Sequence, residues 1–422
     1  MVIVHAVGNV RVSRALNRFR EAGLPITPEE LNASYTMPEG PNAADLYMRA
    51  IEKADIDRTE IKNAAAALRL GDPSMANALL DRNREMLALM RQAAGVAESR
   101  YPSDILEGRE FSGGVISHVG RARRTLETML VDAEVRFQSG DVHGAAQTLL
   151  DALAFTDSFH REPHLITQLV RMAMLVLTVN SLDRFLDTGS FPAEDLEQLQ
   201  QRLAASDSDE SFHNAIAGEV AMGNVSFQLP ASKLAEMLSM DSSLSSGSGT
   251  GKTLLVIGYQ VAGLSTLDRA LYLDFMWESY QASGLPMHER ISALKAIGDR
   301  AERTPPIRIL FLNIFSSLHH ASALDIRTRA SARSARVALA VERFRLEHGA
   351  LPDSLDALVP RYIDAIPEDP FTGKPLLYRK LEPAGYAVYS VGEDSTDNQG
   401  LSSSPTVQPY TTGSDIPFRV ER

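Results

Sequence analysis

The sequence contains no cysteine, which excludes disulfide bonds, thiolate metal sites and cysteine nucleophiles. Aromatic residues make up only 6% of it, and Trp277 is its single tryptophan. Because strands favour aromatic and β-branched side chains, a chain poor in aromatics and rich in alanine and leucine favours helices over a β-sandwich. The sequence therefore predicts a mainly α-helical protein.

Long hydrophobic runs are also absent. The longest uncharged stretches, residues 253–267 and 309–324, are shorter than the roughly 20 residues that a membrane-spanning helix needs. The first residues, MVIVHAVGNVRVSR, lack the charged region and the long apolar core of a signal peptide. We therefore expect no transmembrane segment in this chain, and no signal peptide is visible in it.

Acidic residues outnumber basic residues, 54 against 42, so the formal net charge is −12. A surface of this sign does not favour phosphate groups, and we expect no nucleic-acid partner. With 422 residues, the chain is long enough for two or three domains and a sizeable core.

Three regions of different composition follow one another along the chain. Residues 1–44 are expected to be an N-terminal extended or linker segment, because prolines interrupt them. Residues 45–325 are expected to form a helical domain, with a break at the serine- and glycine-rich stretch 240–253. Residues 326–422 are expected to form a small α+β head.

Two segments of the helical domain resemble each other. LGDPSMANALLD ends at Asp81 and SGDVHGAAQTLLD ends at Asp151, an offset of 70 residues. That offset is about twice the 34-residue period of repeats in which a glycine-containing turn joins two helices. No intervening copies are evident, so a helical hairpin array and an irregular helical bundle both stay open. The apolar stretch 164–182 is predicted to be a central buried helix.

The head begins with a helix rich in alanine and arginine. Val337, Val341 and Phe344 recur at i, i+4 and i+7, which places them on one helical face and predicts that Phe344 is a core residue. Gly349 then stands where a helix C-cap needs a residue that tolerates positive φ, so the helix should stop near His348.

Arginines cover the rest of this helix. They are Arg327, Arg329, Arg333, Arg336, Arg343 and Arg345. We interpret them as a solvated helix face with local pairing to Asp325 and Glu342. The alternative interpretation is a surface for an acidic partner or for anionic lipid headgroups.

Two strands and a turn are predicted after a proline-rich connector. The first strand covers about 376–379 and the second about 386–391, with residues 383–385 as the turn between them. A further short strand is predicted at 416–420.

The order of these motifs resembles a known family. A helix ending in L-E-H-G is followed by a leucine-rich short helix, by D-P-F-x-G-K-P-L-x-Y and by G-Y-x-V-Y-S-V-G-x-D. This stretch resembles the globular head of type II secretion major pseudopilins, in the version appended to large bacterial proteins such as those of Planctomycetes. The chain lacks a prepilin-type N-terminus, so we do not expect a pilin subunit. The resemblance implies a location at or outside the cell envelope.

The acidic loop EDSTDNQG, residues 393–400, is the best ligand candidate. Calcium takes about six to eight oxygen ligands, which clustered Asp, Asn and Ser residues can supply in part. The resemblance implies calcium here, with Asp394 matching the first ligand of the family and Asp415 a later one. Asp397 is an additional ligand suggested by its place in the loop. The predicted calcium site is therefore Asp394, Asp397 and Asp415, and a solvated acidic turn is the alternative.

The string SSGSGTGKT, residues 245–253, approaches a nucleotide-binding P-loop. That motif, G-x-x-x-x-G-K-[ST], wraps a phosphate between a strand and a helix, and Gly251, Lys252 and Thr253 fit its end. Ser246 stands at the first glycine position, and the residues before the string have a helical pattern. We interpret the string as a flexible loop.

These features predict a non-enzymatic scaffold or protein-interaction protein of the bacterial cell envelope, with an unidentified protein partner. The alternative is an enzyme, a nucleotide-binding hydrolase that uses a degenerate P-loop at residues 251–253.

Overall fold

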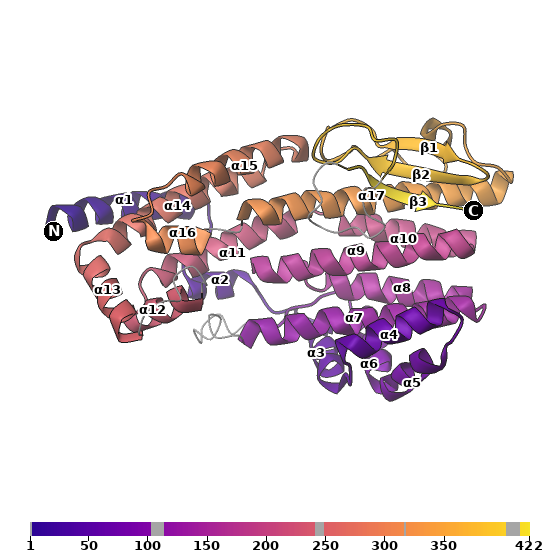
Figure 1. Ribbon diagram of the computed structural model, residues 1–422, viewed down its shortest axis with the longest axis horizontal. Coiled ribbons are helices and arrows are strands. Elements are labelled where there is room, and N and C mark those ends of the chain that lie inside the picture. The colour runs from indigo at the N-terminus through magenta and orange to yellow at the C-terminus, as the bar shows by residue number, and fades with distance from the viewer. Residues whose placement is uncertain (1, 103–113, 241–248, 316–317, 402–413) are drawn as a thin grey trace.

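The computed structural model describes residues 2–102, 114–240, 249–315, 318–401 and 414–422. Within these residues the chain is mainly helical, with a small antiparallel sheet near the C-terminus (Figure 1). The predicted class, a mainly α protein with a small region of strands at its C-terminal end, is confirmed.

The elements follow in chain order. The first helices are α1 (Val2–Glu21), α2 (Pro28–Ser34), α3 (Ala43–Lys53), α4 (Arg58–Arg69), α5 (Ser74–Arg82), α6 (Arg84–Ala94), α7 (Gly114–Gln138), α8 (Val142–Asp157) and α9 (Leu165–Thr188). They are followed by α10 (Ala193–Ser206), α11 (Glu210–Ser226), α12 (Ala231–Met240), α13 (Gly249–Val261), α14 (Leu264–Ser283), α15 (Met287–Glu302), α16 (Ile309–Phe315) and α17 (Leu318–His348). The 3₁₀ turn η4 (Leu355–Leu358) and the strands β1 (Leu377–Leu381), β2 (Gly385–Ser390) and β3 (Ile416–Val420) complete the order.

The prediction that residues 1–44 form an extended segment is wrong. α1 is a helix of 20 residues that packs along α14. Its buried face carries Val12, Ala15 and Phe19 at i, i+3 and i+7, a helical spacing that the sequence already contained.

The two self-similar segments form the same kind of turn. Gly71 and Gly140 both have a φ of +87° just after α4 and α7, a conformation that glycine adopts without strain. Asp72 and Asp141 then accept hydrogen bonds from backbone amides that open the next helix. α4 and α7 differ in length, 12 against 25 residues, so the hairpins share a turn but are not copies of one unit.

α9 is the central helix of the molecule, as predicted for residues 164–182. It packs against α7, α8, α11, α17 and β3. By length and hydropathy it is a candidate for crossing a membrane, but most of its apolar stretch is buried inside the protein. Among the helices that the structure describes, there is thus no clear transmembrane segment.

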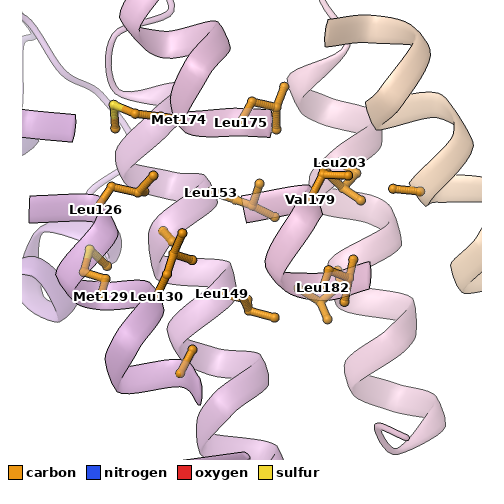
Figure 2. Close-up of a cluster of buried hydrophobic side chains, with 14 of the residues drawn as sticks. Leu126, Met129, Leu130, Leu149, Leu153, Met174, Leu175, Val179, Leu182 and Leu203 are labelled. Carbon is orange, nitrogen blue, oxygen red and sulfur yellow. The ribbon is translucent and has the colours of Figure 1, made fainter. Parts of the chain in front are cut away.

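Buried apolar side chains form two large clusters. The first joins α3–α10 to the second half of α17 and to the sheet. Figure 2 shows part of it, with Leu126 of α7, Leu153 of α8 and Leu182 of α9 among the labelled side chains. The second joins α1 to α11–α16. Because Tyr386 and Phe418 of the sheet belong to the first cluster, the head shares its core with the helical body.

The sheet has the strand order β1-β2-β3. β2 is buried along its whole length, and Val388 pairs with Tyr378 on one side and with Phe418 on the other. The predicted hairpin and third strand are therefore confirmed to within about two residues. α17 ends at His348 as expected, and Gly349 has a φ of +68°.

Phe344 is not the central core residue that its helical face suggested. It is half-buried and stacks on His348, with ring centroids 4.1 Å apart. Tyr386 and Phe418 fill the centre instead, with exposed fractions of 0% and 2%. The helix pattern could not reveal which part of α17 the sheet covers.

The outer edge of β3 lies against α9. Asp183 accepts a hydrogen bond from the Arg419 amide at 3.0 Å, and Asp187 accepts one from the Glu421 amide at 2.7 Å. These carboxylates satisfy edge-strand donors that would otherwise face solvent or another strand. Burial, together with the nearby charge of Asp187, raises the pKa of Asp183 to about 7.

This edge contact predicts a pH dependence of stability. The folded chain keeps a proton on Asp183 up to about pH 7, whereas the ordinary aspartate pKa is 3.8. The free energy of unfolding should therefore fall as pH rises through this window, by roughly 1–2 kcal/mol after allowance for the partial exposure of the side chain. Asp183→Asn keeps the acceptor oxygen without the charge, so urea unfolding of this variant should lose most of that decline. An unchanged pH slope would contradict the assignment.

Candidate functional site

A group of mostly buried charges lies where α8, α9, α10, α15 and α17 meet. Four carboxylates face five guanidinium groups there. The members of this ionic cluster are Asp157, Arg171, Arg202, Asp207, Asp209, Arg290, Asp325, Arg329 and Arg333.

Arg329 and Arg333 of α17 bind the short connection between α10 and α11. Arg329 Nη1 lies 3.1 Å from Asp207 Oδ1, and Arg333 Nε lies 2.7 Å from Asp207 Oδ2. Arg329 also pairs with Asp325, one turn earlier in α17, at 3.0 Å. Burial alone would lower the pKa of Arg329, but the surrounding aspartates outweigh burial and raise that pKa above its ordinary value.

These contacts correct the interpretation of the arginine stripe as a solvated face. The expected local pairs with Asp325 and Glu342 are present. However, Arg329, Arg333 and Arg343 also bind carboxylates 122 to 146 residues earlier in the chain. The sequence pattern could not show this, because the acidic string that contains Asp207 and Asp209 also has the composition of a solvated loop.

Two further arginines join the cluster from α9 and α15, and Arg202 of α10 pairs with Asp157 at 3.1 Å. Arg290 of α15 is 2% exposed and donates to Asp209 Oδ1 at 3.2 Å. Arg171 of α9 donates to Ser211 Oγ at 3.0 Å and lies 3.7 Å from Asp157. Burial raises the pKa of Asp157 and lowers that of Arg171. The cluster therefore joins segments that are remote in sequence through charges most of which are shielded from water, Asp209 being the exposed member.

One contact beside the cluster resembles catalytic geometry. His160 Nδ1 lies 2.6 Å from Ser211 Oγ, and His160 Nε2 lies 3.7 Å from Glu210. A nucleophilic serine must reach a substrate, but Ser211 is 1% exposed and already accepts a hydrogen bond from Arg171. Burial also lowers the pKa of His160. We interpret this serine and histidine as structural.

A shallow surface depression lies between residues 39–41 and 95–98. Its lining supplies the carboxylates of Glu39 and Glu98 but no histidine, hydroxyl or basic side chain. The rest of the lining is glycine, proline, valine and alanine, which carry no polar side chain.

The structure gathers the three predicted calcium ligands around one loop. Asp394 Oδ1 accepts the Thr396 amide at 3.0 Å, and Asp397 Oδ1 accepts the amide two residues later at 2.7 Å. Asp415 accepts loop amides from Asn398 and Gly400. Burial raises the pKa of Asp415, and the charges of Asp397 and Asp394 act in the same direction.

These carboxylates cap loop amides, and the fit to calcium is incomplete. Within the described ranges, no group of three or more His, Cys, Asp or Glu side chains is placed to hold a metal ion. Calcium at Asp394, Asp397 and Asp415 stays a prediction.

Asp369, in the D-P-F motif, links the connector before β1 to the end of β2. Its Oδ1 accepts hydrogen bonds from Ser390 Oγ at 2.8 Å and from the Phe371 amide at 2.9 Å. Its Oδ2 accepts the Val391 amide at 3.0 Å. Sequence reasoning used this motif as a signature without assigning Asp369 a role, although an aspartate before a proline often bonds backbone amides in a turn.

The P-loop-like string has a helical setting. Gly251, Lys252 and Thr253 belong to α13, and the element before it among the described residues is the helix α12. Residues 251–253 are therefore not in a loop, while Ser246 lies outside the described residues. Among the strands that the structure describes, none is parallel to another, so the sheet of a P-loop fold is not found there.

Comparison with known proteins gives no relative on which to base a function. No family model, no curated protein and no solved structure matches this chain.

The ionic cluster predicts a large effect of removing one carboxylate. Asp207→Asn should lower the free energy of unfolding by about 3 kcal/mol, because it leaves Arg329 and Arg333 without their shared counter-charge. Asp353→Asn is the matched control, since Asp353 pairs with Lys380 at 2.7 Å but is fully exposed. Urea unfolding at neutral pH should separate the two variants clearly. Equal, small losses in both would mean that the cluster does not stabilise the fold.

Proposed function

We propose that this chain is a non-enzymatic scaffold that presents its C-terminal head to a protein partner. The observation that carries the proposal is the continuity of α17, a helix of 31 residues. Its first half contributes to the ionic cluster, and it also packs on β2 and β3 of the head. One helix thus belongs to both parts, which favours a head held in one orientation on the body.

The finer part of the proposal is that the head is pseudopilin-like and works at the bacterial cell envelope. The turn around Asp369 and the hairpin after it support it, because they follow the helix in the order that the resemblance implies. A scaffold of this kind acts through the surface that its head offers.

The edge strand β1 is the surface of the head that we assign to the partner. The outer edge of β3 is hydrogen-bonded to α9. At the other side of the sheet, β1 pairs with β2, and among the described residues no further strand lies beside the outer edge of β1. Leu377 at the start of β1 is 36% exposed. An edge strand of this kind can accept an extended segment of another protein as an additional strand.

We also propose that calcium regulates the acidic loop, residues 393–400, which follows β2. If the ion binds there, calcium should raise the melting temperature of the full chain relative to chelator, and Asp394→Ala should remove that rise. Identical midpoints in all these conditions would exclude a calcium site.

The alternative function, a nucleotide-binding hydrolase, has less support. Among the described residues the element before the string is the helix α12, and the first glycine of the motif is replaced by Ser246. Calorimetric titration with ATP and magnesium should show no saturable heat. Saturable binding that Lys252→Ala abolishes would favour the hydrolase.

Photo-crosslinking tests the scaffold directly. A photoreactive residue at position 377 of the full chain, in extract of the source cells, should give an adduct with one defined protein. Position 70 is the control, because Leu70 is 89% exposed but lies on the body after α4. The same adduct should be absent there. Equal adducts at both positions, or none at position 377, would contradict partner binding at β1.

A further inference from the structure

α1 exposes an apolar stripe to solvent. Ile3, Val7 and Val10 are 78%, 50% and 60% exposed, and their spacing of i, i+4 and i+7 places them on one side of the helix. The opposite side of α1 is the one that packs on α14. This helix therefore carries an apolar stripe on a side that faces solvent, where a surface helix is ordinarily polar.

α13 has the same property. Its exposed apolar residues are Leu254, Leu255, Ile257 and Val261, with exposed fractions of 64%, 57%, 43% and 55%. No charged residue occurs from Thr253 to the end of this helix. The other side of α13 packs on α12 and α14.

The two apolar faces lie at the same end of the molecule. His5 Nε2 of α1 lies 3.0 Å from the carbonyl oxygen of Val261, the last residue of α13. Figure 1 shows both helices at the end marked by the N-terminus. We call the seven exposed residues of α1 and α13 the terminal patch. Exposed apolar side chains gathered at one end of a protein are typical of an interaction site.

The charge beside the terminal patch is basic. Arg14 follows Val10 by four residues and continues the same stripe, and it is exposed. The first 20 residues contain four arginines and no acidic residue, although the whole chain has a net charge of −12. Arg11 and Arg18 pair with Asp274 of α14, so Arg14 and Arg20 are the arginines of α1 that face solvent without a described acidic partner.

We infer that the terminal patch docks on a membrane surface that contains anionic lipids. The apolar side chains of α1 and α13 enter the region between headgroups and acyl chains, and Arg14 reaches the lipid phosphates. A second copy of the chain fits less well, because a two-fold dimer through this patch would bring the same basic stripe to both sides of the interface. Charge complementarity thus favours lipid as the occupant.

Vesicle flotation of the full chain tests this inference. The wild-type chain should float with vesicles of phosphatidylcholine containing phosphatidylglycerol and much less with phosphatidylcholine alone. Two variants, Val7→Ser with Val10→Ser and Leu254→Ser with Leu255→Ser, should each weaken binding about tenfold, since affinity follows the apolar area inserted. Arg14→Gln should weaken binding to the anionic vesicles about fivefold.

Leu70→Ser is the matched control, because it removes an exposed leucine far from the terminal patch and should leave binding unchanged. Circular dichroism should show that all variants keep their helix content. Binding that both double variants retain, or no flotation of the wild-type chain, would overturn the inference. So would a dimer, detected by light scattering without vesicles, that the double variants dissociate, because a second copy would then be the occupant. Equal binding to both kinds of vesicle would overturn the role of anionic lipid.

Discussion

The pairing of Arg329 and Arg333 with Asp207 is the contact on which the arrangement of this chain depends. Buried guanidinium groups are costly without counter-charges, so α17 can pack only where the connection between α10 and α11 supplies carboxylates. Arg290 brings α15 to the same place through Asp209. The sheet then packs on the remaining length of α17, and the position of the head follows from the position of this helix.

Local signals in the sequence predicted local structure well. The end of α17 at Gly349, the hairpin, β3 and the turns at Gly71 and Gly140 all follow from residues close to one another in the chain. The role of the arginine stripe did not follow, because its partners lie more than 100 residues away and an acidic loop has the same composition whether it is solvated or buried. The extended segment predicted for residues 1–44 is instead partly the helix α1, whose buried Val12, Ala15 and Phe19 have helical spacing in the sequence.

For the candidate sites too, the sequence predicted local features but not their surroundings. The sequence located the acidic loop, and the structure places Asp394, Asp397 and Asp415 around it, with their oxygens bonded to loop amides. At residues 251–253, by contrast, a short string resembled a phosphate loop while its neighbours form helices. A motif acquires its chemistry from the elements on either side of it. The proposed scaffold therefore rests on how α17 links the body to the head, and the inferred lipid contact rests on the surface at the opposite end.

The absence of cysteine allows a direct measurement of whether the head keeps one orientation on the body. Leu70→Cys on the body and Leu377→Cys on β1 introduce two exposed sites for spin labels. Double electron–electron resonance should give one narrow distance distribution for the labelled chain and a broad or divided one after Arg329→Gln is added. A broad distribution before that change, or a narrow one that survives it, would contradict a junction fixed by the ionic cluster.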